Sequence, residues 1–301
     1  MKKVLVIGEH SYIGTSFQKY VKNKAADIEV TLVGAKNEAW KNADLSQYDA
    51  MLHVAGKVHA DVGKVSDAVR QEYYAINCNL AVEVARIAKV AGIKQFIYPS
   101  SIIIYGESAP YGMQKIINTN TIASPANFYG DSKWKADKKL QELADEQFKV
   151  AIVRLPMVYG TGCKGNYSLL EKLAKKLPVF PKVNNQRSML YIENLCEFFY
   201  QMIVYEDAGI FYPQNAEYTS TSTMVQKIAE CAGRKIYISA MWAPLVWLLG
   251  KMPGKIGRLA NKAFGNCVYD QSISNYRDNS YRKYSLEESI YRIEGGIEKR
   301  R

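Results

Sequence analysis

Short apolar runs alternate with longer segments of helical period through the first half of the chain. Continuous apolar runs are typical of strands that are buried on both faces of a parallel sheet. Because strand–helix–strand connections are right-handed, the alternation predicts an α/β fold built on a doubly wound parallel sheet. The five expected strands contain residues 4–7, 30–33, 51–55, 96–98 and 150–153.

A long helix is expected between the third and fourth of these strands. Apolar side chains recur there at helical spacing, and Gly92 follows the last of them, which is typical of a helix C-terminus. The predicted buried stripe consists of Ile76, Leu80, Val84, Ile87 and Ala91.

The pattern becomes less regular after about residue 160, where several glycines punctuate a loop. Amphipathic helices are expected around residues 193–205 and 221–232. We therefore predict a first domain over residues 1–160 and a smaller α/β domain over 161–301, with returns of the chain to the first domain. A third helical stretch, 241–265, is expected to be interrupted by Gly250, Pro253, Gly254 and Gly257.

Composition and charge narrow the class of protein. Of the 301 residues, 48% are apolar and 23% are charged, which excludes a disordered or collagen-like chain. A net charge of +11 favours anionic partners, although the basic residues are scattered. The five cysteines form no CxxC pair and the three histidines, one of them His59, form no ligand motif. We therefore expect neither a disulfide framework nor a metal site.

Targeting signals are also not apparent in the sequence. The first apolar run is too short for a signal peptide, and residues 241–250 are too short to span a bilayer. We therefore expect a cytoplasmic protein without membrane insertion.

A glycine-rich turn follows the first predicted strand and leads into a helical segment. Gly8, Ser11 and Gly14 are spaced three residues apart in this turn. Such a turn lets the backbone approach a pyrophosphate, and the helix N-terminus attracts its negative charge. Its position at the first strand predicts a dinucleotide-binding site.

The end of the second strand bears on coenzyme choice. Sites that prefer NAD place a carboxylate there to bind the ribose 2′-hydroxyl, but this chain has Gly34, Ala35 and then Lys36. A cation accommodates a 2′-phosphate, so NADP(H) is expected in preference to NAD(H), which stays an alternative. Asp44 and Leu45, just before the third strand, are candidates for adenine contact.

A tyrosine and a lysine four residues apart follow the fourth strand. Tyr129 and Lys133 share one helix face, and an ammonium at that distance can lower a phenol pKa and make the phenol a usable acid or base. The spacing alone is common in this chain, since Tyr20 and Lys24 have it too. Context selects the first pair, because it follows the strand end at Ser101 and precedes the fifth strand.

These motifs together resemble the extended short-chain dehydrogenases, in the branch of nucleotide-sugar epimerases, dehydratases and reductases. The resemblance covers nearly the whole chain and is weakest after about residue 240. Within that branch the chain is most similar to capsule-type reductases of UDP-N-acetyl-4-keto-6-deoxyhexosamines, above all over residues 178–195. The motifs that carry the likeness are Gly8-x-x-Ser11-x-x-Gly14, His53-Val54-Ala55-Gly56, Ser101 to Gly106, Tyr129-x-x-x-Lys133 and Arg154 to Gly160.

The resemblance implies a role for each matching position in a Rossmann-like domain and a UDP-sugar domain. Ser101 would hydrogen-bond the substrate oxygen at C4, Tyr129 would transfer its proton, and Lys133 would orient the nicotinamide ribose. Arg187 would clamp the diphosphate of the sugar nucleotide. Further substrate contacts would come from Asn166, Val179 and Phe180. The implied cofactor contacts are Gly8, Ser11, Tyr12, Ile13, Gly14, Lys36, Asp44, Leu45, Val54, Ala55, Gly56, Tyr129, Lys133, Pro156 and Val158.

The departures from the family pattern guide the choice of reaction. Dehydratases of this family carry an acidic pair directly after the catalytic Ser or Thr, where this chain has Ile102 and Ile103. Many 4-epimerases have asparagine at the position of Met157. We therefore expect NAD(P)-dependent reduction of a UDP-linked 4-keto-6-deoxy-N-acetylhexosamine at C4, for surface or capsular polysaccharide synthesis.

Two other interpretations stay open at this point. One is a UDP-hexose or UDP-N-acetylhexosamine 4-epimerase, which would use the same three residues. The other is a non-catalytic cofactor-sensing or RNA-binding Rossmann protein, but such a protein would need the glycine turn and not the Ser–Tyr–Lys set. We expect a UDP-sugar substrate and no nucleic acid partner, and the family resemblance implies a homodimer.

Overall fold

The chain forms two compact units in a computed structural model that describes residues 1–25, 27–36, 39–41, 43–58 and 65–295. His59 lies outside these described residues. The first unit comprises Met1–Gly106, Ile122–Leu155 and Ile192–Pro213. The second comprises Glu107–Thr121, Pro156–Tyr191 and the described part of Gln214–Arg301. The predicted domain boundary at residue 160 stays a prediction.

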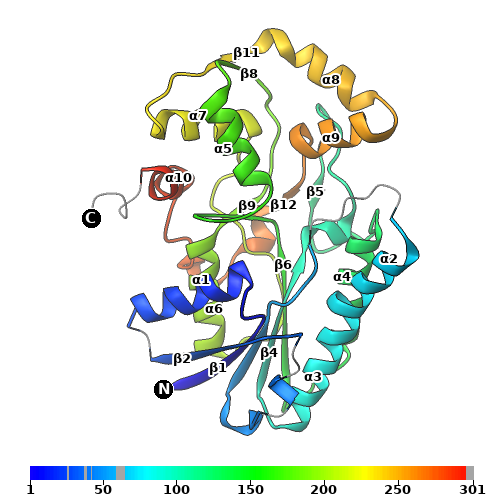
Figure 1. The fold of residues 1–301 in the computed structure, drawn as a ribbon, viewed down its shortest axis with the longest axis vertical. Helices are drawn as coiled ribbons and strands as arrows, with labels where there is room; N and C mark the ends of the chain where they lie inside the picture. Colours follow the sequence, from blue (N-terminus) through cyan, green and yellow to red (C-terminus); the bar gives the residue numbers. More distant parts are fainter. Residues whose placement is uncertain (26, 37–38, 42, 59–64, 296–301) are drawn as a thin grey trace. The chain divides into compact units, whose positions relative to one another are not determined.

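A six-stranded, wholly parallel sheet forms the centre of the first unit (Figure 1). Its order, β10-β6-β4-β3-β1-β2, confirms the predicted doubly wound α/β architecture, because the chain starts in the interior and winds outward in both directions. The five strands expected from the apolar runs are all present, and β10 is an additional edge strand. The strands are β1 (Lys2–Ile7), β2 (Ile28–Val33), β3 (Ala50–His53), β4 (Gln95–Ser101), β6 (Lys149–Leu155) and β10 (Gly209–Phe211).

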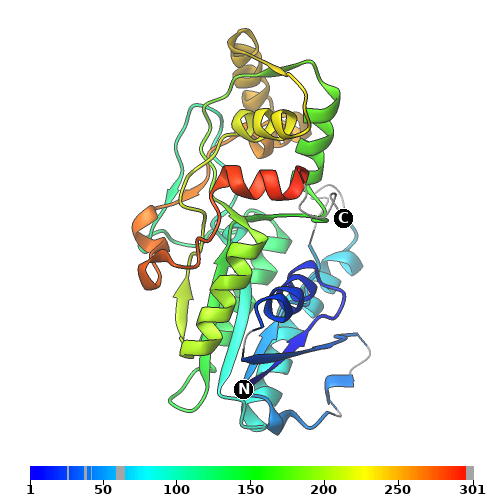
Figure 2. The same ribbon diagram turned by 90° about the vertical axis from the view of Figure 1, so that its left-hand side faces the viewer.

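Helices cover both faces of this sheet, as the two views in Figures 1 and 2 show. Helices α1 and α6 pack together on one face, where the rings of Phe17 and Phe199 meet edge to face. Helices α3 and α4 lie on the other face. The helices of this unit are α1 (Tyr12–Asn23), α2 (Asp67–Tyr74), α3 (Leu80–Val90), α4 (Phe128–Gln141) and α6 (Ile192–Tyr205).

The helix predicted between the third and fourth strands is longer and less regular than expected. A π-helical turn, Ala75–Asn79, joins α2 to α3. In the predicted stripe Val84 is buried, and Leu80, Ile87 and Ala91 are partly buried and pack against the hydrophobic core. Small residues on the neighbouring positions, such as Ala81, Ala85 and Ala88, are fully or almost fully buried too. The prediction of the buried stripe is therefore largely confirmed, but the buried face of the helix is wider than expected.

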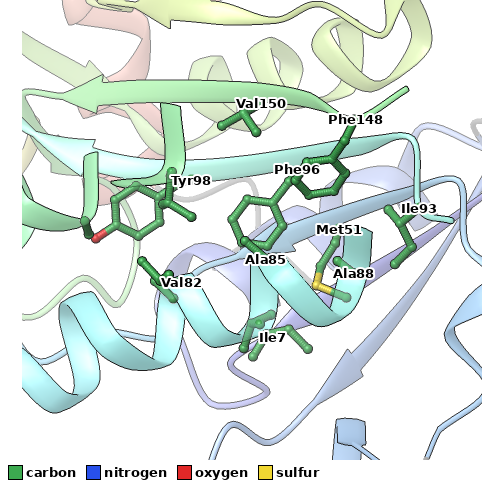
Figure 3. Packing of buried hydrophobic residues seen from close by; sticks show 14 of the residues in the cluster. Ile7, Met51, Val82, Ala85, Ala88, Ile93, Phe96, Tyr98, Phe148 and Val150 are labelled. Carbon is green, nitrogen blue, oxygen red and sulfur yellow. The ribbon is translucent and has the colours of Figure 1, made fainter. Parts of the chain in front are cut away.

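The hydrophobic core of the first unit lies between the sheet and helices α3 and α4. Met51 of β3 and Phe96 of β4 are fully buried and face the small residues of α3 (Figure 3). Alanines at the helix surface allow α3 to approach the sheet closely, so large side chains of the strands fill the space. This packing holds the carboxyl ends of β1, β3 and β4 in a fixed arrangement.

The second unit is made of short strands and peripheral helices. Three parallel pairs, β11 with β8, β12 with β5 and β7 with β9, replace an extended sheet. The strands are β5 (Ile116–Ile117), β7 (Met157–Tyr159), β8 (Val179–Pro181), β9 (Met189–Tyr191), β11 (Tyr237–Ser239) and β12 (Val268–Tyr269). The helices are α5 (Asn166–Lys176), α7 (Thr221–Cys231), α8 (Ala243–Lys251), α9 (Gly254–Phe264) and α10 (Leu286–Glu294).

The expected helices of the second half are largely confirmed, with one correction. Helices α6 and α7 lie where amphipathic segments were predicted. The third helical stretch breaks between α8 and α9, at Pro253 and just before Gly254. Gly250 lies inside α8 and Gly257 lies inside α9, so the prediction that these two glycines interrupt the helices is wrong. A Cβ atom at Gly257 would collide with the Met252 carbonyl oxygen, so this glycine serves close packing and not a helix end.

None of the helices in the described part of the chain is long and apolar enough to cross a membrane. The five cysteines are free thiols. Within the residues that the structure describes, no group of three or more His, Cys, Asp or Glu side chains is placed to hold a metal ion.

Candidate active site

The strand end of β4 and the start of α4 bring together two of the three predicted catalytic residues. Ser101 is the last residue of β4, and Tyr129 lies in the first turn of α4. The Ser101 hydroxyl lies close enough to the Tyr129 phenol to lower the pKa of that phenol. The Ser101 hydroxyl also accepts a hydrogen bond from the amide of Ile103 at 3.3 Å, which holds its orientation. A serine hydroxyl and a phenol therefore converge on one point at the carboxyl edge of the sheet.

Gly130 explains how Tyr129 reaches this position. A Cβ atom at Gly130 would lie 2.9 Å from the Ile103 carbonyl oxygen, a separation that real Cβ atoms do not adopt. The absence of a side chain lets the start of α4 pack directly on the turn Ile102–Tyr105 that follows β4. Asn127 caps the helix by accepting a hydrogen bond from the Gly130 amide at 2.9 Å. The sequence interpretation did not single out either residue.

Lys133 lies one helical turn beyond Tyr129 and is almost completely buried. Its Nζ donates a hydrogen bond to the Pro99 carbonyl at 3.1 Å and lies 4.6 Å from the centre of the Tyr98 ring. A buried ammonium needs such partners, since desolvation disfavours its charge. The strand backbone thus fixes the amine near the end of β4.

The pKa values of this pair differ from the expectation. Burial raises the pKa of Tyr129 to about 12, and the nearby Ser101 hydroxyl lowers it by less than burial raises it. Burial also lowers the pKa of Lys133 to about 8, which the Asp137 carboxylate partly opposes. The prediction that Lys133 lowers the phenol pKa is therefore wrong for this structure, because desolvation dominates both groups. At neutral pH the phenol is protonated and can act as a proton donor.

The glycine turn after β1 has the geometry of an anion-binding loop. Gly8 adopts a φ of +124°, which favours glycine, and its amide donates to the Val33 carbonyl at 2.8 Å. Ser11 caps α1 by accepting a hydrogen bond from the Gly14 amide at 2.9 Å. Tyr12 and Ile13 lie in the first turn of that helix. This places a helix N-terminus directly after a tight turn, as dinucleotide phosphates require.

The segment after β3 packs against the glycine turn. A Cβ atom at Gly8 would lie 2.9 Å from the Ala55 amide nitrogen, and one at Gly14 would lie 3.1 Å from the Val54 side chain. A Cβ atom at Gly56 would lie 3.5 Å from the Lys133 Nζ. The structure therefore brings the predicted cofactor residues that follow β1 and β3 together with Lys133 of α4. Because these glycines have no side chains, the space beside them stays open and fits an extended dinucleotide.

The predicted adenine-side residues are less tightly grouped. Lys36 is exposed in the bend that follows β2. Asp44 is also exposed and accepts hydrogen bonds from the amide and hydroxyl of Ser46, which lower the pKa of its carboxyl group. The Leu45 side chain is buried in the hydrophobic core, so only its backbone remains for a ligand.

His53 ends β3 and is fully buried beside Phe96 and Tyr98, with both ring centroids 6.2 Å away. Neither imidazole nitrogen has a hydrogen-bond partner among the described residues. Burial, together with the nearby Lys133, lowers the pKa of His53 to about 3. The imidazole is therefore neutral throughout the physiological range and packs as an aromatic ring.

Asn77 was missed in the sequence, where it lies among the apolar residues of a predicted helix. It is fully buried in the π turn, and its amide group donates to the Ser132 hydroxyl at 3.1 Å and to the Lys57 carbonyl at 3.0 Å. Its carbonyl oxygen accepts a hydrogen bond from the Lys57 amide at 2.7 Å. Asn77 thus joins the loop after β3 to α4, next to Tyr129. The sequence signal that could have indicated it is an asparagine between the apolar residues Ile76 and Cys78 of a predicted helix.

The four predicted substrate residues lie in the second unit. Asn166 is exposed at the start of α5, and Val179 and Phe180 lie on β8. The guanidinium of Arg187 donates to the Lys262 carbonyl near the end of α9 at 2.5 Å, and burial lowers its pKa. Phe180 is buried against the ring of Phe264, whereas Val179 is partly exposed. Pro156 and Val158, expected near the cofactor, also belong to this unit.

The chain belongs to the NAD dependent epimerase/dehydratase family, whose pattern it matches over residues 4–212. This confirms the resemblance drawn from the motifs. Among curated relatives, the UDP-glucose 4-epimerase of Vibrio cholerae is 27% identical over 277 residues, which cover 84% of this chain and 83% of that protein.

Solved structures of the same architecture include both epimerases and reductases. A UDP-N-acetylglucosamine 4-epimerase from Bacillus cereus superposes with a TM-score of 0.74 at 15% identity, covering 98% of each chain. A dTDP-4-dehydrorhamnose reductase from Bacillus anthracis, solved with NADP, superposes with a TM-score of 0.68 at 19% identity. It covers 97% of this chain and 98% of its own. At these identities the likeness establishes the fold.

Proposed function

We propose that the protein is a nicotinamide-dependent oxidoreductase that reduces a 4-keto group of a UDP-linked 6-deoxy-N-acetylhexosamine. The observation that carries this proposal is the convergence of Ser101, at the end of β4, and Tyr129, in the first turn of α4, one helical turn from Lys133. Ligands of doubly wound sheets bind at this edge. The oxygen of a ketone bound there could accept hydrogen bonds from both the Ser101 hydroxyl and the Tyr129 phenol.

The cofactor would bind along the glycine turn and the segment after β3. Gly8 and Gly14 leave room for the pyrophosphate, and the start of α1 offers amide groups and the positive end of its dipole. Gly56 leaves similar room beside the Lys133 amine, where a ribose hydroxyl would accept or donate a hydrogen bond. When bound, the nicotinamide supplies the hydride. The exposed Lys36 supports a preference for NADP(H), with NAD(H) as the alternative.

The protonation state of Tyr129 supports reduction as the direction of chemistry. Reducing a ketone requires a proton for the C4 oxygen, and a phenol whose pKa is raised to about 12 carries that proton at neutral pH. Ser101 would hydrogen-bond the same oxygen and orient the carbonyl group. Lys133 would hold the ribose and stabilise the phenolate that remains after proton transfer.

Dehydration is disfavoured by the side chains next to Ser101. Ile102 and Ile103 occupy the positions where dehydratases of this family carry an acidic pair. Neither isoleucine can protonate a leaving hydroxyl group or remove a proton from C5. Met157, at a position where many epimerases carry asparagine, adds a weaker argument for reduction.

A 4-epimerase is the second candidate, and the relative from Vibrio cholerae favours it. That protein is named a UDP-glucose 4-epimerase and aligns with 84% of this chain. An epimerase would use Ser101, Tyr129 and Lys133 as well, but it would return the hydride to the opposite face of the same sugar. The two reactions therefore differ in whether coenzyme is consumed.

We also propose that the sugar nucleotide is held by the second unit. Arg187 would pair with the diphosphate, while Asn166, Val179 and Phe180 would contact the diphosphate and the base. A homodimer, a cytoplasmic location and a role in surface polysaccharide synthesis accompany this proposal as predictions.

The experiment separates the two reactions by the fate of the coenzyme. A UDP-4-keto-6-deoxy-N-acetylhexosamine is supplied with NADPH, and absorbance of the reduced nicotinamide is followed. In a parallel assay, UDP-galactose or UDP-N-acetylgalactosamine is incubated without added coenzyme. We expect stoichiometric loss of NADPH in the first assay and no interconversion in the second.

The opposite pair of results would replace the reductase with the epimerase. Rapid interconversion of the UDP-sugar without coenzyme loss requires that the hydride be returned to the substrate. Inactivity in both assays, with the fold intact and NADPH bound, would contradict both candidates and favour a cofactor-sensing role.

A further inference from the structure

Helices α8 and α9 of the second unit present an unusual number of apolar side chains to solvent. Trp242, just before α8, and Trp247 within it are each almost half exposed. Within α8, Val246 is buried and Leu249 is partly buried, whereas Leu245, Trp247 and Leu248 are exposed. The exposed apolar residues of this pair, here called the α8–α9 face, are Met241, Trp242, Leu245, Trp247, Leu248, Met252, Ile256 and Leu259.

The charged side chains between residues 230 and 270 are all basic. Between Glu230 and Asp270 the chain has no acidic residue, but it has six basic ones. Four of these, Lys251, Lys255, Arg258 and Lys262, lie on the two helices or at their ends, and all four are exposed. Among the described residues none of the four forms an ion pair through its side chain. The six basic residues are Arg234, Lys235, Lys251, Lys255, Arg258 and Lys262.

The cations and apolar residues of α9 occupy adjacent strips of the helix. Lys255, Arg258 and Lys262 are spaced three and four residues apart and therefore share one side. Ile256 and Leu259 are spaced three apart on the neighbouring side and are each about half exposed. A helix with an apolar strip bordered by basic residues is suited to the boundary between lipid headgroups and acyl chains.

The two helices form one platform, shown as the orange pair in Figure 1. At Gly250 a Cβ atom would lie 2.7 Å from Asn261, and at Gly257 it would meet the Met252 carbonyl oxygen, so glycines allow close packing. The Asn261 side chain donates a hydrogen bond to the Gly250 carbonyl at 2.9 Å. The exposed apolar side chains of α8 are thereby held in a fixed relation to the basic strip of α9.

We propose that the α8–α9 face docks the protein on the surface of a bilayer that contains anionic lipids. The tryptophans, leucines, methionines and isoleucine of this face would enter the headgroup boundary, and the lysines and Arg258 would pair with lipid phosphates. Charge complementarity selects this partner. A second copy of the chain would place one basic surface against another, and the like charges would repel.

This mode of binding differs from a membrane span. The helices would lie in the interface, so the finding that no described helix can cross a bilayer is compatible with it. It does not conflict with the expectation of no membrane insertion, because that expectation concerned the length needed to span a bilayer. The proposal does not depend on the proposed reaction, because lipid binding is measured without substrate.

The test is flotation of the purified full-length protein with lipid vesicles. Vesicles of phosphatidylcholine alone are compared with vesicles in which about a third of the lipid is phosphatidylglycerol. We expect binding to the anionic vesicles and at least about tenfold weaker binding to the neutral ones. High salt should weaken the binding, since screening reduces the attraction between basic side chains and headgroups.

Two variants with matched controls separate the contribution of the basic side chains to lipid binding from that of the apolar side chains. The charge-reversal double variant R258E/K262E should bind anionic vesicles more than about 20-fold more weakly, given about fivefold for each cation lost. Its control is K172E/K176E, the same charge change on exposed positions of α5. The apolar variant Leu248→Asn should weaken binding severalfold, and its control is Leu169→Asn on α5, since both leucines are exposed by a little over half.

Several results would overturn the proposal. One is absence of binding to either vesicle, and another is equal binding to both. A third is equal loss in the α5 controls, which would indicate a general effect of net charge. If sedimentation shows instead that the protein self-associates, and Leu248→Asn abolishes that association without changing lipid binding, the face is an interface between copies.

Discussion

Tyr129 carries the acid function proposed for the site, because its phenol is protonated at neutral pH and lies close to the Ser101 hydroxyl. Replacing it by phenylalanine removes the hydroxyl group and keeps the ring that packs against Tyr73. Tyr129→Phe should therefore lower turnover by about 10²–10⁴-fold, which is the usual contribution of a positioned acid. The measurement is the steady-state rate of NADPH loss with the keto sugar.

Thermal unfolding and coenzyme titration of Tyr129→Phe serve as controls and should match the wild type closely. Turnover within about threefold of the wild type would remove this residue from the mechanism.

His53 makes the stability of the fold depend on pH. In the folded protein its pKa is lowered to about 3, whereas an unfolded histidine takes up a proton near pH 6.5. Between these values the unfolded chain binds more protons, so stability falls as the pH falls, by about 1.4 kcal/mol for each pH unit. His53→Phe retains an aromatic ring between Phe96 and Tyr98 and removes the titration. As the pH falls from 6.5 towards 4, the wild type should therefore lose more unfolding free energy than His53→Phe.

The measurement is urea unfolding of both proteins at a series of pH values. The carboxyl groups titrate in the same pH range in both proteins, so their effects cancel when the two unfolding free energies are subtracted. Parallel stability curves would show that the imidazole is solvated in the folded state.

At the scale of elements, the turn between β1 and α1 combines positive φ with close packing. Gly8 and Gly92 both have positive φ, but only Gly8 is crowded: a Cβ atom added there would lie 2.9 Å from Ala55, whereas one at Gly92 would meet nothing within 4 Å. Gly92→Ala should cost about 1 kcal/mol of unfolding free energy, from backbone strain alone. Gly8→Ala should cost about 2–3 kcal/mol and also weaken coenzyme binding, since the added methyl group displaces the segment after β3.

Chemical unfolding and coenzyme titration of both variants check this prediction. Equal losses of stability in the two variants, with coenzyme binding intact in Gly8→Ala, would contradict the close approach between the turn and β3.

We expect the coenzyme preference to depend on the residues that follow β2. Lys36 is exposed there, and no carboxylate occupies residues 34–36. NADPH should bind more tightly than NADH, and Lys36→Glu should reverse or abolish the difference, because a carboxylate repels the 2′-phosphate and accepts a hydrogen bond from the 2′-hydroxyl. Calorimetric titration of both coenzymes into both proteins measures this. Tighter binding of NADH to the wild type would refute it.

At the scale of the whole molecule, a buried ion pair joins the strands and helix that carry the site. Arg154 of β6 donates two hydrogen bonds to the Asp137 carboxylate of α4, at 2.9 and 3.0 Å, and both side chains are buried. Arg154 also donates to the hydroxyl groups of Tyr105 and Tyr212, and Asp137 accepts from Ser100 at 2.9 Å. This network connects β4, β6 and α4, so it positions the segment that holds Tyr129.

Asp137→Asn should destabilise the fold by about 3–5 kcal/mol, since it leaves the Arg154 guanidinium buried without a counter-charge. The exposed pair of Lys227 and Glu287 provides the control, and Glu287→Gln should change stability by less than about 1 kcal/mol. Urea unfolding measures both. Similar small effects in the two variants would mean that water or another group solvates Arg154 in the core.

The parts of this protein that followed from its sequence are those encoded locally. Apolar runs predicted five strands of the sheet, because a strand buried on both faces needs continuous apolar residues. The spacing of Gly8 and Gly14 and of Tyr129 and Lys133 predicted a phosphate turn and an acid–base pair, since both depend on short distances along one turn or helix. The family followed from the order of these motifs.

Other features depend on residues that are distant in sequence and were decided only by the tertiary structure. Asn77 joins α4 to the loop after β3, Gly130 allows α4 to touch the turn after Ser101, and Asp137 pairs with Arg154 across the core. The pKa of Tyr129 likewise rises instead of falling, because burial depends on the surrounding fold and not on the neighbouring lysine. Local spacing determined which residues lie on each element of this protein, and packing between elements determined which of them meet and how strongly they are desolvated.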